Sequence, residues 1–248
     1  ALEDIAGRPM ILHLLDRVIA SRHISDPRDV VICTTTAASD DPLVPVVEEY
    51  GCSVFRGSVH DILHRFDSAI SCHGLDAVIQ ADGDDPLTAT EYMDITMDRL
   101  LEDETAEIVT VSGVPLGTAS KSFSREAMTK VLKAYRTEEN DTGFIYFFTK
   151  TGICNHVEIK CDNPEHIHDK ARLTLDYDDD LRVFRGIFDA LYEPGQIFGL
   201  SQVVDWLNCN PELVEINRHV EQEYWQRTRD KAVLRYVAAD GNIAQIDV

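Results

Sequence analysis

Along the first half of the chain, segments with two different hydrophobic patterns alternate. Apolar residues three and four apart predict amphipathic helices, whereas short continuous apolar runs predict buried strands. Pro9 suits a first helical turn, Ser58 an N-cap and Gly51 a helix stop. The predicted helices cover residues 9–22, 41–50, 58–71 and 90–101, and the predicted strands cover residues 29–33, 52–55, 76–80 and 107–111.

This alternation of strand and helix is typical of βαβ units. It predicts an α/β fold with a doubly wound, mostly parallel sheet that helices cover on both faces. In such sheets ligands bind beyond the carboxyl ends of the strands, where the connection order switches. The residues just after Cys33, Phe55 and Gln80 are therefore the first candidates for chemistry.

The second half of the chain is less regular. Strands are predicted at 121–123, 144–149, 156–161 and 172–175, and helices at 124–135, 178–191 and 199–208. The two strands within 144–161 would form a projecting β hairpin. Its aromatic run at 144–148 would leave one apolar face outside the sheet, which a partner usually covers, so we expect a homodimer. Packing of this run against the chain's own second half is the alternative.

The sequence becomes charged after about Asn217. It therefore predicts a domain over residues 1–217, followed by a C-terminal tail or linker over 218–248.

Composition narrows the classes of protein that fit. The 44% apolar share is enough for a sizeable core, and a net charge of −21 argues against nonspecific binding to nucleic acid. No run of eighteen apolar residues is present, so we expect no membrane span. The six cysteines form no Cys-x-x-Cys pair. Reduced thiols in a cytoplasmic protein are the simplest interpretation.

An acidic turn directly follows the predicted strand that ends at Gln80. It contains Asp82, Gly83, Asp84 and Asp85. Gly83 would let a nucleotide approach the backbone closely. Adjacent carboxylates repel one another unless a cation lies between them, and Mg²⁺ prefers one or two carboxylates with substrate phosphates. The alternative is a solvated turn, because Asp, Gly and Pro are ordinary turn residues.

A second acidic segment, residues 176–180, also lies between a predicted strand and a predicted helix. Asp178, Asp179 and Asp180 would cap that helix and complement its dipole. Asp176 is less well explained by capping, because it belongs to the end of the strand. We therefore treat Asp176 as a candidate ligand.

The predicted strand 52–55 leads into a third candidate segment, with Gly57 and Ser58 before a helix. Backbone N–H groups at such a helix N-terminus can bind an anion. Arg65 would either clamp a phosphate or carboxylate, or pair on the surface with Asp61 four residues earlier. These two interpretations stay open.

Taken in order, several segments resemble the cytidylyltransferases of acidic sugars. The likeness is to the spore coat polysaccharide biosynthesis cytidylyltransferases, with CMP-KDO synthetase and CMP-sialic acid synthetase as cousins. It runs over about residues 2–217 and is carried by residues 2–13, 31–35, 55–66, 82–87, 172–181 and 210–217. Segment 82–87 resembles the family's "GDxPL" motif, and segment 172–181 resembles "RlTvDtxeDl".

The resemblance implies the sheet of the nucleotide-diphospho-sugar transferases. It also implies a Mg²⁺-dependent enzyme that couples a nucleoside triphosphate, expected to be CTP, to a sugar or sugar acid with release of pyrophosphate. Asp84 and Asp176 would hold Mg²⁺, with Asp84 and Arg65 as catalytic residues. The nucleotide would be bound by Thr34, Thr35, Gly57, Ser58, Asp82 and Gly83. Relatives are dimers.

Three departures from the family pattern affect these expectations. The basic loop of the type Arg-x-x-Ser-x-Arg-Leu-Pro-Gly-Lys, expected before Ala1, is not among these 248 residues. The usual Gly-x-Asp-x-Glu is replaced around Gly117 to Lys121, and an Arg by Gln80. A guanylyl- or other sugar nucleotidyltransferase, and a catalytically inactive binding domain of the same fold, therefore remain alternatives.

Overall fold

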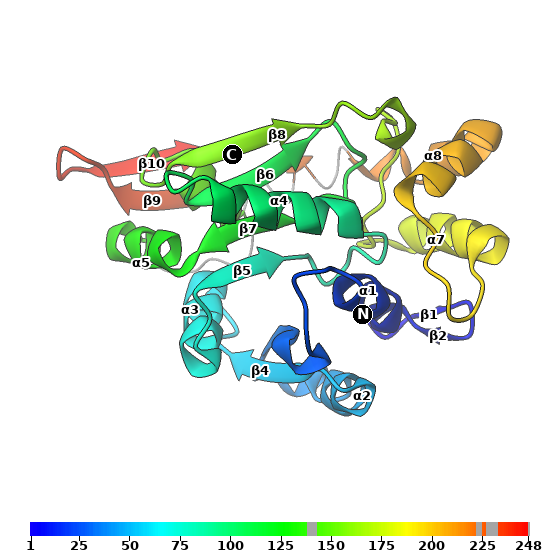
Figure 1. Ribbon diagram of the computed structural model, residues 1–248, viewed down its shortest axis with the longest axis horizontal. Coiled ribbons are helices and arrows are strands. Elements are labelled where there is room, and N and C mark those ends of the chain that lie inside the picture. Colours follow the sequence, from blue (N-terminus) through cyan, green and yellow to red (C-terminus); the bar gives the residue numbers. More distant parts are fainter. Residues whose placement is uncertain (138–142, 222–224, 227–232, 248) are drawn as a thin grey trace.

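The computed structural model describes residues 1–137, 143–221, 225–226 and 233–247. Helices and strands alternate through its first half, as the sequence predicts (Figure 1). In chain order these elements are β1 (Asp4–Ile5), β2 (Arg8–Pro9), α1 (Met10–Ile19), β3 (Val31–Thr35), α2 (Leu43–Tyr50), β4 (Ser53–Gly57), α3 (Ile62–His73), β5 (Ala77–Gln80), α4 (Thr90–Glu102) and β6 (Ile108–Ser112). The second half continues with β7 (Lys121–Ser124), α5 (Arg125–Ala134), α6 (Ile145–Thr149), β8 (His156–Lys160), α7 (Asp178–Leu191), α8 (Leu200–Cys209), α9 (Pro211–Asn217), β9 (Val233–Val237) and β10 (Ile243–Asp247).

The central sheet is mixed rather than mostly parallel. Four strands follow the order β5-β7-β6-β8, in which β6 and β8 are parallel and β7 runs antiparallel to both of its neighbours. β3 and β4 form a separate parallel pair. β7 is antiparallel because residues 113–120, which connect it to β6, contain no helix, and a parallel crossover needs about a dozen residues or more.

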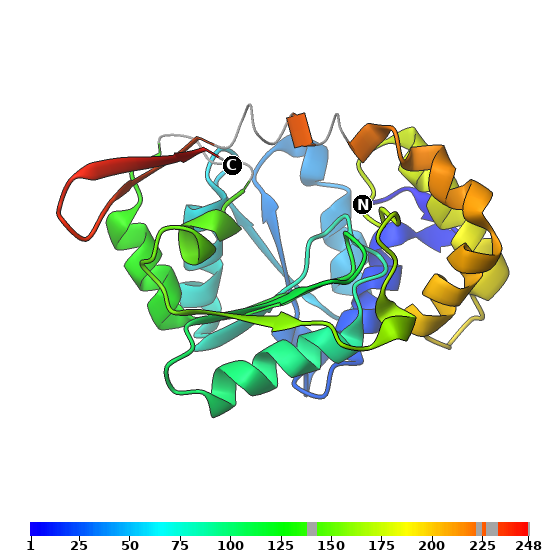
Figure 2. The same ribbon diagram turned by 90° about the horizontal axis from the view of Figure 1, so that it is seen from above.

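Helices cover both faces of the four-stranded sheet, so the doubly wound layering is present. Met97 and Leu100 of α4 pack with Val109 on one face. On the other face α3, α5 and α6 surround Ile108 and Phe123, both 0% exposed (Figure 2). Among the described residues no helix is long and apolar enough to span a membrane.

The predicted hairpin over residues 144–161 is wrong. Residues 145–149 form the helix α6, and β8 joins the central sheet beside β6. The buried residues of the aromatic run have the spacing of a helix, because Phe147 and Phe148 follow Phe144 by three and four positions. All three are buried in this chain's own core. These three rings therefore form no exposed aromatic face for a second subunit to cover.

A projecting hairpin does exist in the second half, formed by β9 and β10 (Figures 1 and 2). Leu234 anchors it in the cluster around Phe123, and Arg136 N–H donates to the Arg235 carbonyl. Both strands fall within the predicted tail. Residues 222–224, 227–232 and 248 of that tail lie outside the described residues.

Two further boundaries differ from the sequence predictions. α3 begins at Ile62 rather than Ser58, because the Asp61 carboxylate accepts the N–H of His64 and is the N-cap. Residues 172–175 form a single bridge, between Arg172 and Leu116, in place of a strand.

Candidate active site

The turn after β5 is fixed by its own backbone. Asp85 N–H donates to the Asp82 carbonyl at 3.1 Å, and Thr88 N–H donates to the Asp85 carbonyl at 3.0 Å. These bonds hold the acidic residues at the carboxyl end of β5, where the sequence places them. β7 begins beside the end of β5, because Lys121 pairs with Gln80.

Asp84 and Asp176, the two predicted metal ligands, are brought together by the backbone. Leu175 N–H donates to the carbonyl of Asp84 at 2.9 Å, so the segment before Asp176 runs beside the acidic turn. Burial, together with the charges of Asp82 and Asp176, raises the pKa of Asp84 to about 6. A carboxylate that two others repel is suited to a cation.

Asp85 is the most deeply enclosed residue of the turn, with 5% of its surface exposed. Burial, together with the charges of Asp82 and Asp84, raises its pKa well above the ordinary value. Its Oδ1 atom has no hydrogen-bond partner in the described part of the chain. Because the sequence motif gives this position no role, Asp85 is a residue that pattern reasoning missed.

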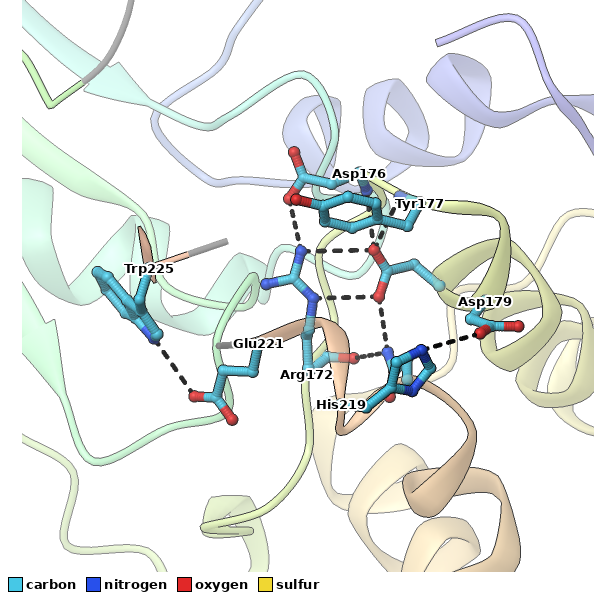
Figure 3. A network of polar contacts seen from close by, with 9 residues as sticks. Arg172, Asp176, Tyr177, Asp179, His219, Glu221 and Trp225 are labelled. Atoms are coloured by element: carbon cyan, nitrogen blue, oxygen red, sulfur yellow. Dashed lines mark hydrogen bonds and ion pairs between the residues drawn. The ribbon is translucent and has the colours of Figure 1, made fainter. Parts of the chain in front are cut away.

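Asp176 is held by an arginine that is almost completely buried. The side chain of Arg172 is 1% exposed, and its Nη2 donates to Asp176 Oδ2 at 2.6 Å, whereas its Nε donates to Asp180 Oδ1 at 3.1 Å (Figure 3). Asp180 also accepts the N–H groups of Asp176 and Tyr177, both at 3.0 Å. The orientation of Asp176 is therefore set by Arg172.

The same network reaches the last helices. Asn217 Nδ2 donates to the Arg172 carbonyl at 2.9 Å and to Asp180 Oδ1 at 2.8 Å. His219 lies 3.4 Å from Asp179 (Figure 3). Asp180 sits in the first turn of α7 and accepts the N–H of the N-cap residue Tyr177, as predicted for a cap, and at 0% exposure it also binds Arg172.

Lys121 supplies a positive charge inside the acidic cluster. Its Nζ lies 2.6 Å from Asp82 Oδ2, and its side chain is 18% exposed. Burial opposes ionisation of Asp82, but Lys121 and a hydrogen bond from Gln80 hold the pKa of that carboxyl below its ordinary value. The sequence marked Lys121 only as a departure from the family pattern. No pattern in the sequence indicates this contact, because it depends on the strand register that places Lys121 opposite Gln80.

The predicted nucleotide-binding residues of β3 and β4 form a second group. The hydroxyls of Thr34 and Thr35 both donate to Asp40 Oδ2, at 2.7 and 2.5 Å. These hydrogen bonds, with the Thr35 hydroxyl contributing most, lower the pKa of Asp40 to about 2. Arg56 donates to the Thr35 carbonyl and pairs with Asp41 at 2.7 Å.

Gly57, Ser58 and Arg65 are packed against one another. A Cβ atom on Gly57 would lie 2.9 Å from the Phe55 ring and 3.0 Å from the Arg65 side chain, so only glycine fits. Arg65 Nη1 donates to the Ser58 carbonyl at 2.6 Å. Of the two interpretations of Arg65, the side-chain ion pair with Asp61 does not form in the described part of the chain, although Arg65 N–H donates to the Asp61 carbonyl at 3.1 Å. Asp61 instead caps α3, which places a carboxylate where an anion would bind.

The structure thus brings Asp82, Asp84 and Asp176 together at the carboxyl end of β5. It places Thr34, Thr35, Gly57, Ser58 and Arg65 at the carboxyl ends of β3 and β4 and the start of α3. Gly83 lies in the acidic turn, where an added Cβ atom would meet nothing within 4 Å. Within the described ranges, no hydrogen bond or ion pair joins the two groups.

The acidic turn fits a divalent cation with few protein ligands. No group of three His, Cys, Asp or Glu side chains in the described part of the chain is arranged to hold a metal ion. Asp84 and Asp176 supply two carboxylates. Mg²⁺ commonly uses one or two carboxylates, with phosphate oxygens and water completing its shell. The mutual repulsion that raises the pKa of Asp84 is what such a cation would relieve.

The chain is similar to known proteins over most of its length. A family model described as a cytidylyltransferase matches residues 1–153. The chain is 27% identical over 236 residues to an uncharacterised protein of Methanocaldococcus jannaschii, covering 92% of each. It is 23% identical over 213 residues to the spore coat polysaccharide biosynthesis protein SpsF of Bacillus subtilis, covering 85% of this chain and 88% of that protein.

Two solved structures share the fold. A cytidylyltransferase from Leptospira borgpetersenii superposes with a TM-score of 0.76 at 20% identity, over 86% of this chain and 88% of that one. A CMP:2-keto-3-deoxy-manno-octonic acid synthetase complexed with CTP superposes with a TM-score of 0.54 at 14% identity, over 76% and 90%. The resemblance found in the sequence is therefore confirmed, as is the fold of the nucleotide-diphospho-sugar transferases.

Proposed function

Because the chain belongs to the cytidylyltransferase family, we propose that it transfers the cytidylyl group of CTP to a hydroxyl of a sugar or sugar acid. The observation that carries the proposal is the meeting of Asp84 and Asp176, which come from distant parts of the chain, at the carboxyl end of β5. That edge is where α/β sheets of this type bind ligands.

In the proposed reaction a sugar oxygen attacks the α-phosphorus of CTP. A new P–O bond forms, the bond between the α- and β-phosphates breaks, pyrophosphate leaves and the hydroxyl proton passes to solvent. Asp84 and Asp176 would hold Mg²⁺, which when bound neutralises charge that develops on the α-phosphate. Arg172 keeps Asp176 in one orientation, through a contact of 2.6 Å, so that this ligand needs no reorganisation.

The two groups of site residues divide the work in this proposal. Thr34, Thr35 and Gly57 lie where the nucleoside would approach β3 and β4. The acidic turn lies where the phosphates and the sugar would meet. Arg65 Nη1 donates to the Ser58 carbonyl, so Arg65 would also support the loop between β4 and α3.

Pyrophosphate release tests the proposal. Purified protein is incubated with Mg²⁺, with each of CTP, ATP, GTP and UTP, and with a panel of neutral sugars and sugar acids. We expect release with CTP and one class of sugar, and its loss in Asp84→Asn. Release with another nucleotide in place of CTP would instead support the guanylyl- or other nucleotidyltransferase alternative.

We also propose that the protein is a homodimer, on family grounds and on the shape of the β9–β10 hairpin. This hairpin projects from the body, and Ile243 near its tip is 70% exposed (Figure 1). Light scattering at micromolar concentration is expected to give twice the monomer mass of 27.9 kDa. A monomer mass would remove this part of the proposal and leave the chemistry unaffected.

A further inference from the structure

The Asp82 carboxylate is anchored on one side and open on the other. Gln80 Nε2 donates to its Oδ1 at 2.7 Å, and Lys121 Nζ donates to its Oδ2 at 2.6 Å. Gln80 and Lys121 face each other across the β5–β7 ladder, so both anchors come from rigid strands. The Asp82 side chain nevertheless remains 40% exposed. Its oxygens are therefore fixed in place while part of the carboxylate still meets solvent.

The oxygens of Asp82 and Gln80 can accept further hydrogen bonds. An ionised carboxylate offers about four lone-pair sites, and in the described residues Asp82 uses one on each oxygen. Gln80 is only 4% exposed, and its Oε1, in the same amide that donates to Asp82, is buried without a hydrogen-bond partner. Buried acceptors without partners are uncommon, and they call for a donor.

The charge around Asp82 selects the kind of donor. Asp84 and Asp85 follow within three residues, and the charge of Lys121 is already engaged by Asp82. A phosphate or a carboxylate of a substrate that contacted Asp82 directly, with no cation between them, would therefore meet repulsion. Two neighbouring hydroxyl groups carry no charge and present two O–H donors side by side, as a carboxylate with two fixed oxygens requires.

We propose that Asp82, positioned by Gln80 and Lys121, binds two neighbouring hydroxyls of a substrate. The proposal rests on the proposed cytidylyl transfer, since both of its substrates carry such a diol: the ribose of CTP and the acceptor sugar. Asp82 would then select substrates that carry neighbouring hydroxyls. Its two anchors, Gln80 and Lys121, lie where the sequence departs from the family pattern.

Paired analogues that lack one hydroxyl test the contact directly. In the first arm, calorimetry with Mg²⁺ compares the binding of CTP, 2′-deoxy-CTP and 3′-deoxy-CTP. In the second, pyrophosphate release at saturating CTP gives KM for each sugar and for its monodeoxy analogue. The proteins are wild type, Asp82→Asn, Lys121→Met and Asp189→Asn, the last a control at an exposed position of α7.

We expect Asp82→Asn to weaken binding of the hydroxyl-bearing substrate by about tenfold or more, because hydrogen bonds to a charged group are among the stronger ones. The same variant should bind the deoxy analogue almost as tightly as wild type does, since the analogue already lacks the hydroxyl that Asp82 would contact. Lys121→Met should reduce the same discrimination, and Asp189→Asn should not. If Asp82 discriminates between CTP and its deoxy analogues, the bound diol is the ribose. If it discriminates between a sugar and its monodeoxy analogue, the bound diol belongs to the acceptor.

Equal effects of Asp82→Asn on every substrate and its deoxy analogue, or no effect on any of them, would overturn the diol site. If the wild type releases pyrophosphate under these conditions, the proposed function stands without it. If Asp82 discriminates between CTP and a deoxy analogue in binding but no pyrophosphate is released, the diol site stands and the proposed function fails.

Discussion

Replacing Asp84 by Asn should stabilise the metal-free protein at neutral pH. The carboxyl group of Asp84 has its pKa raised from 3.8 to about 6, by burial first and then by Asp82 and Asp176. A group whose folded pKa lies above its unfolded value binds its proton more tightly in the folded state. The folded state is therefore disfavoured as the pH rises from about 4 to about 6, and the whole penalty persists above pH 6.

The size of the effect follows from the shift. Two units of pKa correspond to about 3 kcal/mol of unfolding free energy, and solvent that reaches the side chain reduces this to about 1–2 kcal/mol. Asn has nearly the same shape and cannot ionise, so it removes the penalty. The gain of Asp84→Asn over wild type should be near zero at pH 4 and reach its full value at pH 7.5.

Urea unfolding in the presence of a chelator measures this difference at both pH values. Asp176→Asn is the matched control, because its carboxylate pairs with the buried Arg172 and its loss should cost about 1–3 kcal/mol. Opposite signs for two neighbouring Asp→Asn changes are the signature we expect. A gain for Asp84→Asn that does not change between pH 4 and pH 7.5 would refute the electrostatic reasoning.

Three further substitutions, two of them paired with a control variant, test the fold that supports the site. Arg172→Leu should cost about 3–5 kcal/mol in urea unfolding, because Asp180 is 0% exposed and would lose its partner; a loss below about 1 kcal/mol would contradict the network. Gly117→Ala should destabilise by more than about 1 kcal/mol, because Gly117 has φ +89° and a Cβ atom would lie 2.0 Å from the Leu173 carbonyl oxygen. Gly83→Ala is its control, since an added Cβ meets nothing within 4 Å and melting should barely change. Phe148→Ala should cost about 3–5 kcal/mol as a core truncation, whereas Ile243→Ala, at 70% exposure, should change stability by less than about 0.5 kcal/mol. Equal effects at Phe148 and Ile243 would argue against burial of α6.

The first half of the fold could be predicted because its signals are local. Periodicity located α1 to α4 and β3 to β6 to within a few residues, with Gly51 at the predicted stop. The direction of β7 was missed, although residues 113–120 are too few for the helix of a parallel crossover. The run at 144–148 is too short to separate a strand from a helix, and only packing decided in favour of α6.

The candidate site was predictable where one segment carried it. The acidic turn and Asp176 were found from their positions after apolar runs and from the family motifs. Lys121 and Arg172 were not, because their roles depend on partners: Lys121 pairs with a residue 39 positions away, and Arg172 bridges two carboxylates within a folded loop. Contacts of this kind arise from tertiary structure, which residue types alone do not encode.

Transfer of label from CTP is the most direct test of the central claim. CTP labelled in its α-phosphate is incubated with Mg²⁺, the protein and each sugar of the panel, and the products are separated by charge. The account predicts that the α-label moves into a sugar conjugate that also contains cytidine, and that Asp84→Asn abolishes the transfer. If the label stays in CTP with every sugar, or appears only in free CMP, the protein is not the cytidylyltransferase that we propose.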